Sequence, residues 1–159
     1  MLATVENSLD PPERLRALER AEAAPYLGMP ASPWWVPPLF GAWLAAHLAS
    51  FALWRASELA FIAMTVALCA GMGAFVGWLS QRTGALPVPG RGTPPSEIRH
   101  EYRRYAVGAV AIAALVVCAW WWAGTAAASV SVFVLTTAGL SLYQYRYQRA
   151  AASVRERLT

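Results

Sequence analysis

The side chain best placed for chemistry is His47, the ionisable group that lies well inside an apolar run. Such a residue within a membrane span is by default a functional hypothesis. On a helix, His47 would share a face with four larger or polar residues: Trp43, Ser50, Phe51 and Trp54. There it would shuttle a proton, bind a metal or line a pocket. The alternative is a neutral structural histidine hydrogen-bonded to a serine or a carbonyl, because the membrane penalty acts on the charged form.

The chemical roles of His47 each lack a partner in the sequence. Haem ligation between helices would require a second buried histidine, whereas His100 lies in a polar segment. A proton relay would require a buried acid, which the apolar runs do not provide. The structural role is therefore favoured, and we expect no bound cofactor or metal, while His47 stays a candidate functional residue.

A second candidate cluster has helical spacing: Glu97, His100, Glu101 and Arg104. Glu97, His100 and Glu101 would be able to ligate a metal. The same i,i+3 and i,i+4 spacings are those of a solvated charged helix face, which we favour. The chain has no phosphate-binding G-x-x-x-x-G-K-[ST] motif, and no serine nucleophile with a triad is recognisable. We therefore expect a protein without enzymatic activity.

The elements that carry these residues are apolar helices. Of the 159 residues, 57% are hydrophobic and only 14% are charged, which favours a membrane protein over a soluble domain. The sequence predicts an all-α, integral membrane four-helix bundle made of two transmembrane helical hairpins. Its expected parts are a cytosolic N-terminal segment (1–33), a first hairpin (34–79, spans 37–54 and 58–79), a linker (80–104), a second hairpin (105–147, spans 105–123 and 125–145) and a basic tail (148–159).

The segments outside the hairpins are polar. Asp10, Pro11 and Glu13 form a helix start that predicts an amphipathic helix over 11–24, lying on the membrane surface or on a partner. A loosely ordered tail is the alternative. The first part of the linker is rich in proline and glycine and should be irregular. A second helix start at 93–97 should run directly into the third span.

The arginines predict the orientation. All thirteen basic residues are arginines, and every one except Arg55 lies in the N-terminal segment, in the linker or after the end of the fourth span at 145. By the positive-inside rule, we expect these segments and both termini to be cytosolic. The spans would lie in the bacterial cytoplasmic (inner) membrane. Because the arginines flank apolar segments, we expect them to bind anionic lipid headgroups rather than nucleic acid.

The aromatic residues agree with two membrane interfaces. Trp34 and Trp35 stand among prolines directly before the first span, and Pro37 and Pro38 can begin a helix without losing a hydrogen-bond donor. An indole at headgroup depth buries its rings and keeps its N–H wet. The predicted interface anchors are Trp34, Trp35, Trp54, Trp78, Trp120, Trp121, Trp122 and Tyr143. The triple tryptophan at 120–122 is alternatively a binding surface for a ligand or a lipid.

Small residues recur every three or four positions in the first two spans. The seams are Ala42, Ala45, Ala49, Ala52 and Ala56 in the first span, and Ala60, Ala63, Ala67, Ala70, Ala74 and Gly77 in the second, where Gly73 and Gly77 also form a G-x-x-x-G. Such seams let helix backbones approach closely in lipid. We expect them to pack within the chain; dimerisation is the other interpretation. Cys69 and Cys118 read as small apolar residues rather than disulfide partners.

The charged N-terminal helix, the stretch "SPWWVPPLFGAWL", the two hairpins and the tail "YQYRYQRAAASVRERL" resemble a loose group of uncharacterised small four-span membrane proteins of high-GC Gram-positive bacteria. The resemblance covers most of the chain and implies a location but no activity. We expect a non-enzymatic accessory or interaction protein, with a membrane-protein partner bound at 11–24 and 93–104. The alternative is a small oligomeric transporter or channel with His47 on its polar lining; a membrane enzyme with a cytosolic active site ranks third.

Overall fold

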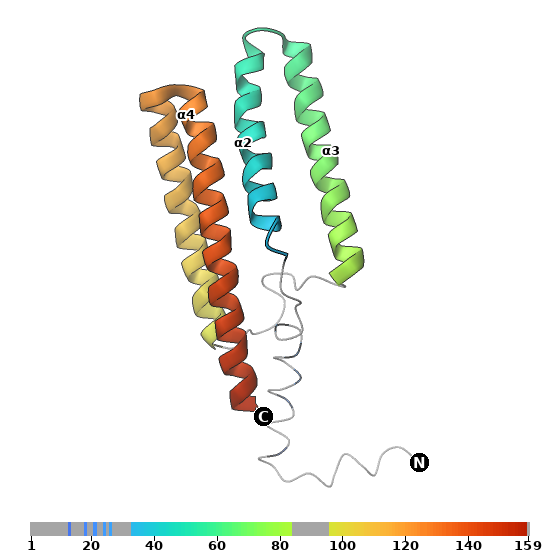
Figure 1. Ribbon diagram of the computed structural model, residues 1–159, viewed down its shortest axis with the longest axis vertical. Coiled ribbons are helices and arrows are strands. Elements are labelled where there is room, and N and C mark those ends of the chain that lie inside the picture. Colours follow the sequence, from blue (N-terminus) through green and yellow to red (C-terminus); the bar gives the residue numbers. More distant parts are fainter. Residues whose placement is uncertain are drawn as a thin grey trace.

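The computed structural model describes residues 33–83 and 96–158, together with the single positions Glu13, Leu18, Ala21, Ala24 and Tyr26. The described residues form helices and contain no strand, which confirms the all-α class. The helices are α2 (Val36–Trp54), α3 (Glu58–Thr83) and α4 (Ser96–Leu158) (Figure 1). Each of the three contains a stretch long and apolar enough to cross a membrane.

The division into four separate helices is not what the structure shows, because the third and fourth expected spans both belong to α4. This element has 63 residues and is interrupted at Gly124, whose φ of 80° and ψ of −176° are not helical. The two halves of α4, before and after Gly124, lie side by side (Figure 1). Their ring contacts agree, since the rings of Tyr105 and Tyr143 are 4.8 Å apart.

Local signals in the sequence explain where α2 and α3 begin. Prolines occupy the first turn of α2, where a missing N–H leaves no hydrogen bond unmade. The connection to α3 is a tight turn in which the Leu53 carbonyl accepts the N–H groups of Ala56 and Ser57. The Ser57 hydroxyl then accepts the N–H of Ala60 at 3.3 Å and caps α3. This turn and Gly124 lie at the same end of the molecule, here named the turn end (Figure 1).

Helix α2 lies between α3 and α4, and α3 contacts α2 alone among the described helices. Helix α2 approaches α4 closely at Gly41, which is buried. A Cβ atom at Gly41 would lie 2.5 Å from Oγ1 of Thr137 and 2.9 Å from the Phe133 carbonyl oxygen. A glycine is therefore required where these two backbones meet.

The expected packing of the two small-residue seams against each other within the chain is wrong. Helix α3 instead contacts α2 through large rings: Trp35 with Phe75 and Trp78, and Phe51 and Trp54 with Phe61. The seam of α3 is left largely uncovered: Ala60, Ala63, Ala67, Ala70, Gly73 and Ala74 are exposed, Gly77 is half-buried, and a Cβ added at either glycine would meet nothing within 4 Å. On α2, Ala42, Ala49 and Ala52 are exposed and Ala45 is half-buried; Ala56, in the turn after α2, is exposed. The rings fill the α2–α3 interface and leave the seams outside it.

An indole hydrogen bond adds direction to this aromatic interface. Trp43 donates its Nε1–H to the backbone carbonyl of Leu68 at 2.9 Å, which joins α2 to the middle of α3. Tryptophan generally requires such a partner when its ring is removed from water. A seam of alanines would not have supplied this bond.

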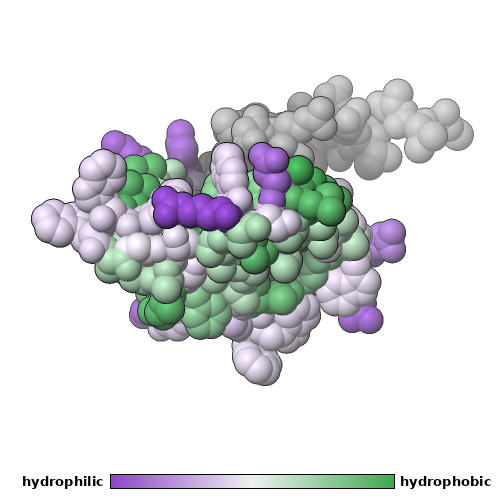
Figure 2. All heavy atoms as spheres, turned by 90° about the horizontal axis from the view of Figure 1, so that it is seen from above, coloured by the Kyte–Doolittle hydropathy of each residue, from purple (hydrophilic) through white to green (hydrophobic). Residues whose placement is uncertain are grey.

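Unlike in a soluble domain, the most apolar segments of the described helices are exposed. The largest fully buried side chains are Ile98, Val154 and Pro37, of which Ile98 and Val154 lie near the two ends of α4, outside the apolar spans. No residue in the most apolar window of α3 is buried. Viewed onto the turn end, the surface is mostly apolar or weakly polar, with few strongly hydrophilic groups (Figure 2). Such an extended apolar surface marks an interaction with lipid or protein.

The end opposite the turn end, where α2 begins and α4 begins and ends, is here named the arginine end. Within the polar N-terminal segment, Tyr26 is buried, and its carbonyl accepts the hydroxyl hydrogen of Tyr147 at 2.9 Å. Of the expected helix over 11–24, Glu13, Leu18, Ala21 and Ala24 are helical and exposed. The rest of that helix, and the linker from 84 to 95, lie outside the described residues.

Replacing Gly124 tests the reversal of α4. The backbone conformation at Gly124 is open essentially to glycine alone, so Gly124→Ala should lower the free energy of unfolding by about 1–3 kcal/mol. Gly71→Ala is the control, because Gly71 lies in the helical interior with open space around it and should be neutral or gain up to about 1 kcal/mol. The measurement is denaturant unfolding in detergent, followed by circular dichroism. Equal responses of the two variants would contradict the assignment.

Candidate functional site

His47 lies in α2 with its ring half-buried and 5.0 Å from the ring of Trp43. Ser50 donates its hydroxyl hydrogen to the backbone carbonyl of His47 at 2.7 Å, so this serine does not bond the imidazole. The Nδ1 atom of His47 is buried and has no hydrogen-bond partner among the described residues. One imidazole nitrogen is thus buried without a polar contact among the described residues.

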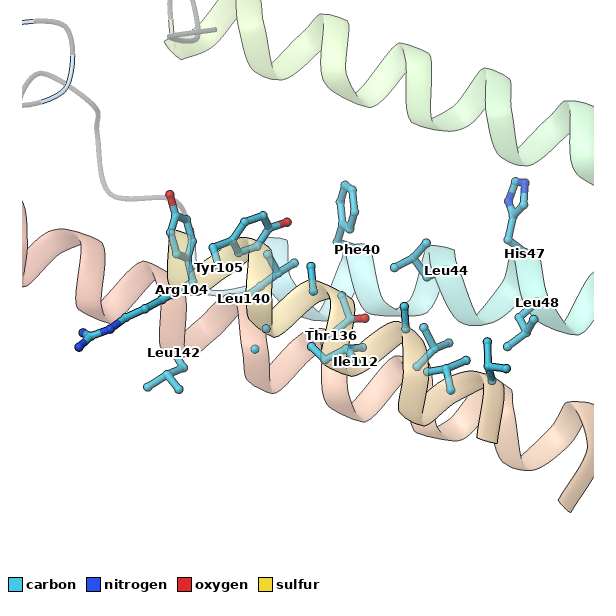
Figure 3. A pocket seen from close by; sticks show the side chains of 18 of the residues that line it. Phe40, Leu44, His47, Leu48, Arg104, Tyr105, Ile112, Thr136, Leu140 and Leu142 are labelled. Carbon is cyan, nitrogen blue, oxygen red and sulfur yellow. The ribbon is translucent and has the colours of Figure 1, made fainter. Parts of the chain in front are cut away.

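The imidazole of His47 lines a groove of about 620 Å³. One wall is α2, from Phe40 to Phe51, and the other is the first half of α4, from Arg104 to Trp120. The second half of α4 contributes Thr136 and Leu140 between them, as Figure 3 shows. The size and the predominantly apolar lining are those of small-molecule sites in proteins.

The two ends of the groove differ. At the turn end, the rings of Phe51 and Trp120 are 6.0 Å apart and bring the walls together. At the arginine end, the lining becomes polar: Glu101, Arg104, Tyr105, Tyr143 and Arg146. In Figure 3, Arg104 and Tyr105 lie at one end of the row of apolar side chains, with His47 and Leu48 toward the other.

One ion pair is present in this polar end. Arg104 donates from Nη1 to Oε1 of Glu101 at 2.8 Å, one helical turn away. The Glu101 side chain is largely buried, at 12% exposure, whereas that of Arg104 is 54% exposed. The exposed guanidinium therefore keeps donors available for a further acceptor, and the groove lining has two arginines to one acid.

The second candidate cluster is divided by the structure. Glu101 pairs with Arg104, and His100 is exposed on the same helix. The side chain of Glu97 lies outside the described residues. Within 33–83 and 96–158 and the five single positions, no three His, Cys, Asp or Glu side chains come together to bind a metal. Glu101 thus belongs to the lining of the groove.

The expected interface anchors fall at the two ends of the molecule. Trp34, Trp35, Trp78 and Tyr143 lie toward the arginine end, and Trp54, Trp120, Trp121 and Trp122 lie at the turn end. Arg82 sits 4.8 Å from the ring centroid of Trp78. The triple tryptophan is divided: Trp120 lines the groove, whereas Trp121 and Trp122 are 86% and 87% exposed.

Sequence reasoning missed the groove, although it singled out five of its lining residues: His47, Glu101, Arg104, Trp120 and Tyr143. The groove joins α2 to both halves of α4, and Arg104 and Arg146 are more than forty positions apart in the chain. The only local signal is the run of small residues at the start of the third span, where Gly108 and Ala109 line the groove. A Cβ at Gly108 would meet nothing within 4 Å, so the wall is hollow there.

Comparison with known proteins finds no matching family, no matching curated protein and no matching solved structure. The chemistry of the groove follows from its lining, which holds one acid, one histidine, one threonine and no serine or cysteine. Such a lining is suited to holding an elongated apolar molecule with a polar group at the arginine end.

Replacing His47 tests the state of its ring. Because a buried polar atom without a partner costs free energy, His47→Leu should leave stability unchanged or raise it by about 1 kcal/mol in the purified, detergent-exchanged protein. Trp43→Phe is the contrasting variant, since it removes the bond to Leu68 and should cost about 1 kcal/mol. Denaturant titration reports both. A marked loss of stability in His47→Leu would reveal a hydrogen bond to Nδ1 and contradict this description.

Proposed function

We propose that the chain is an integral protein of the bacterial cytoplasmic membrane with four spans arranged as two hairpins. The spans are 36–54, 58–82, 105–123 and 125–145, the last two being the halves of α4. The exposure of the apolar helices supports this, because lipid would cover them. The backbone break at a single residue, Gly124, supports a turn at the membrane surface.

In this proposal both termini and the linker are cytosolic. Arg55 lies at the turn end, and the other described arginines lie at or beyond the arginine end. The positive-inside rule then places the arginine end in the cytoplasm. Tryptophans lie near both ends, where they would meet the two membrane–water interfaces. Trp78 is one of them, and it is in contact with Arg82.

We propose further that the protein is a non-enzymatic accessory protein that binds a transmembrane helix of another membrane protein. The observation that carries this is α3, which contacts α2 on one side and turns its small-residue seam away from it. In lipid, exposed alanine and glycine gain little by facing acyl chains, whereas they let another helix approach closely. The bound helix would complete the packing that α2 does not supply.

A small oligomeric transporter or channel is the second candidate. It is favoured by His47, which lines the groove and whose buried Nδ1 atom has no hydrogen-bond partner among the described residues. The contact between Phe51 and Trp120 narrows the groove at the turn end, so a path through the membrane would have to form between subunits. A role of this kind requires a defined homo-oligomer.

Site-directed photo-crosslinking tests the accessory role. A diazirine amino acid at Ala67, on the seam, should yield one defined adduct with another membrane protein, and Ala67→Leu should reduce co-purification of that protein at least tenfold. The same amino acid at Cys69, which is exposed on α3 but off the seam, should not yield the adduct, and Cys69→Leu should retain the partner. The measurements are mass spectrometry of the adduct and the mass of the complex in mild detergent.

The outcomes separate the two candidate functions. An adduct of Ala67 with a second copy of the chain alone, together with a stable homo-oligomer, would overturn the accessory role and favour transport. Equal effects of Ala67→Leu and Cys69→Leu would show that the seam is not the binding surface.

A further inference from the structure

The groove between α2 and the two halves of α4 has a polarity that its separate residues do not reveal. Its walls meet at the turn end, where Phe51 and Trp120 are in contact, and its lining carries charge only at the arginine end. An elongated ligand would therefore place its apolar part toward the turn end and its polar group at the arginine end. This is the distribution of polarity in a membrane lipid.

The length of the groove suits an acyl chain. Its α4 wall runs from Arg104 to Trp120, which at 1.5 Å per residue is about 24 Å. That length exceeds half of the roughly 30 Å hydrocarbon core, which is the depth of one leaflet. Between the two ends the wall carries glycine, alanine and branched aliphatic residues, and Gly108 leaves open space beside the charged end.

The charged side chains at the arginine end of the groove determine which headgroup charge the groove would bind. Arg104 and Arg146 come from different halves of α4 and both line the groove, with Tyr105 and Tyr143 beside them. Glu101 is the acid there, and it is bonded to Arg104. Arg146 is therefore the arginine of the groove lining that has no acid of the lining beside it. With two arginines and one glutamate, the lining has a net positive charge, which favours an anion. Guanidinium groups match phosphate oxygens in geometry and charge.

We propose that this groove is a binding site for one anionic phospholipid of the cytosolic leaflet. One acyl chain lies along the apolar walls, and the phosphate accepts hydrogen bonds from Arg146 and from the exposed side of Arg104. This inference rests on the proposed membrane location and orientation, which put the arginine end at the cytosolic surface. Basic pockets between helices on that side are where anionic headgroups bind.

The lipid would also connect parts of the protein that are otherwise joined by few polar contacts. Its chain would touch α2 and both halves of α4, so that binding favours the reversed form of α4. Away from the charged end, the polar side chains of His47 and Thr136 line the same groove. A lipid in place would exclude water from the neighbourhood of that imidazole.

Native mass spectrometry of the full chain tests the proposal. Protein purified by detergent exchange would be offered phosphatidylglycerol or phosphatidylcholine with matched acyl chains. One phosphatidylglycerol per chain should be retained at least tenfold more strongly than phosphatidylcholine. Arg146→Gln should reduce that preference at least fivefold, whereas Arg149→Gln should preserve it, because Arg149 is exposed and does not line the groove.

A second variant tests the apolar walls. Ala109→Phe fills the groove and should reduce retention of both lipids, while Ala106→Phe, on the same half of α4 but outside the lining, should not. Equal retention of the two lipids, or equal effects of Arg146→Gln and Arg149→Gln, would overturn the site. A chain that remains in the carbonate-extracted membrane pellet but shows no lipid preference refutes this site alone. A chain that is released by carbonate extraction refutes the membrane location as well.

Discussion

The reversal of α4 at Gly124 is the constraint on which the rest of the structure depends. A helix of 63 residues would extend about 95 Å if it were straight, which is several times the hydrocarbon thickness of a bilayer. One residue with positive φ turns it into two antiparallel segments. Only then do Tyr105 and Tyr143 meet, and only then does Gly139 lie against Ile112, where an added Cβ would be 3.0 Å from Cδ1. The wall of the groove and its charged end both require this arrangement.

Around that reversal, contacts between helices are made in two different ways. The α2–α4 interface depends on a close approach of the two helix backbones, where Gly41 lies against Thr137 and Phe133. The α2–α3 interface depends on large rings and one indole hydrogen bond. Some hydroxyl groups within the helices are satisfied locally, as when Ser129 donates to the carbonyl of Thr125, whereas Oγ1 of Thr65 and Oγ1 of Thr137 are buried without a partner among the described residues. In the groove, polar side chains are contributed by two arginines, Glu101, two tyrosines, Thr136 and His47. Function is therefore expected from surfaces and from the groove.

The sequence predicted those features that depend on neighbouring residues. Apolar runs and the prolines in the first turn of α2 act over a few positions, so the helical class and the start of α2 could be predicted. The third and fourth spans, predicted over 105–123 and 125–145, correspond to the two halves of α4, with Gly124 between them. The prediction that the two small-residue seams pack against each other was wrong, because residue spacing defines a stripe on each helix but not the surface that packs against it. The α2–α3 interface is instead formed by large rings, among them those of Trp35, Phe61 and Phe75. The groove was not predicted, because Arg104 and Arg146 meet only through the fold.

The most direct test of the account is a crosslink between the halves of α4. In a chain whose native cysteines are replaced by serine, Ile112→Cys and Gly139→Cys should join within one molecule on addition of a short thiol crosslinker. The control pair, Val110→Cys with Gly139→Cys, should not, because Val110 is 72% exposed and faces away. The predicted result is an intramolecular crosslink at 112 and 139 alone, identified by peptide mass spectrometry in native membranes. Its absence would contradict the reversal, since an unbroken helix would hold these positions about 40 Å apart.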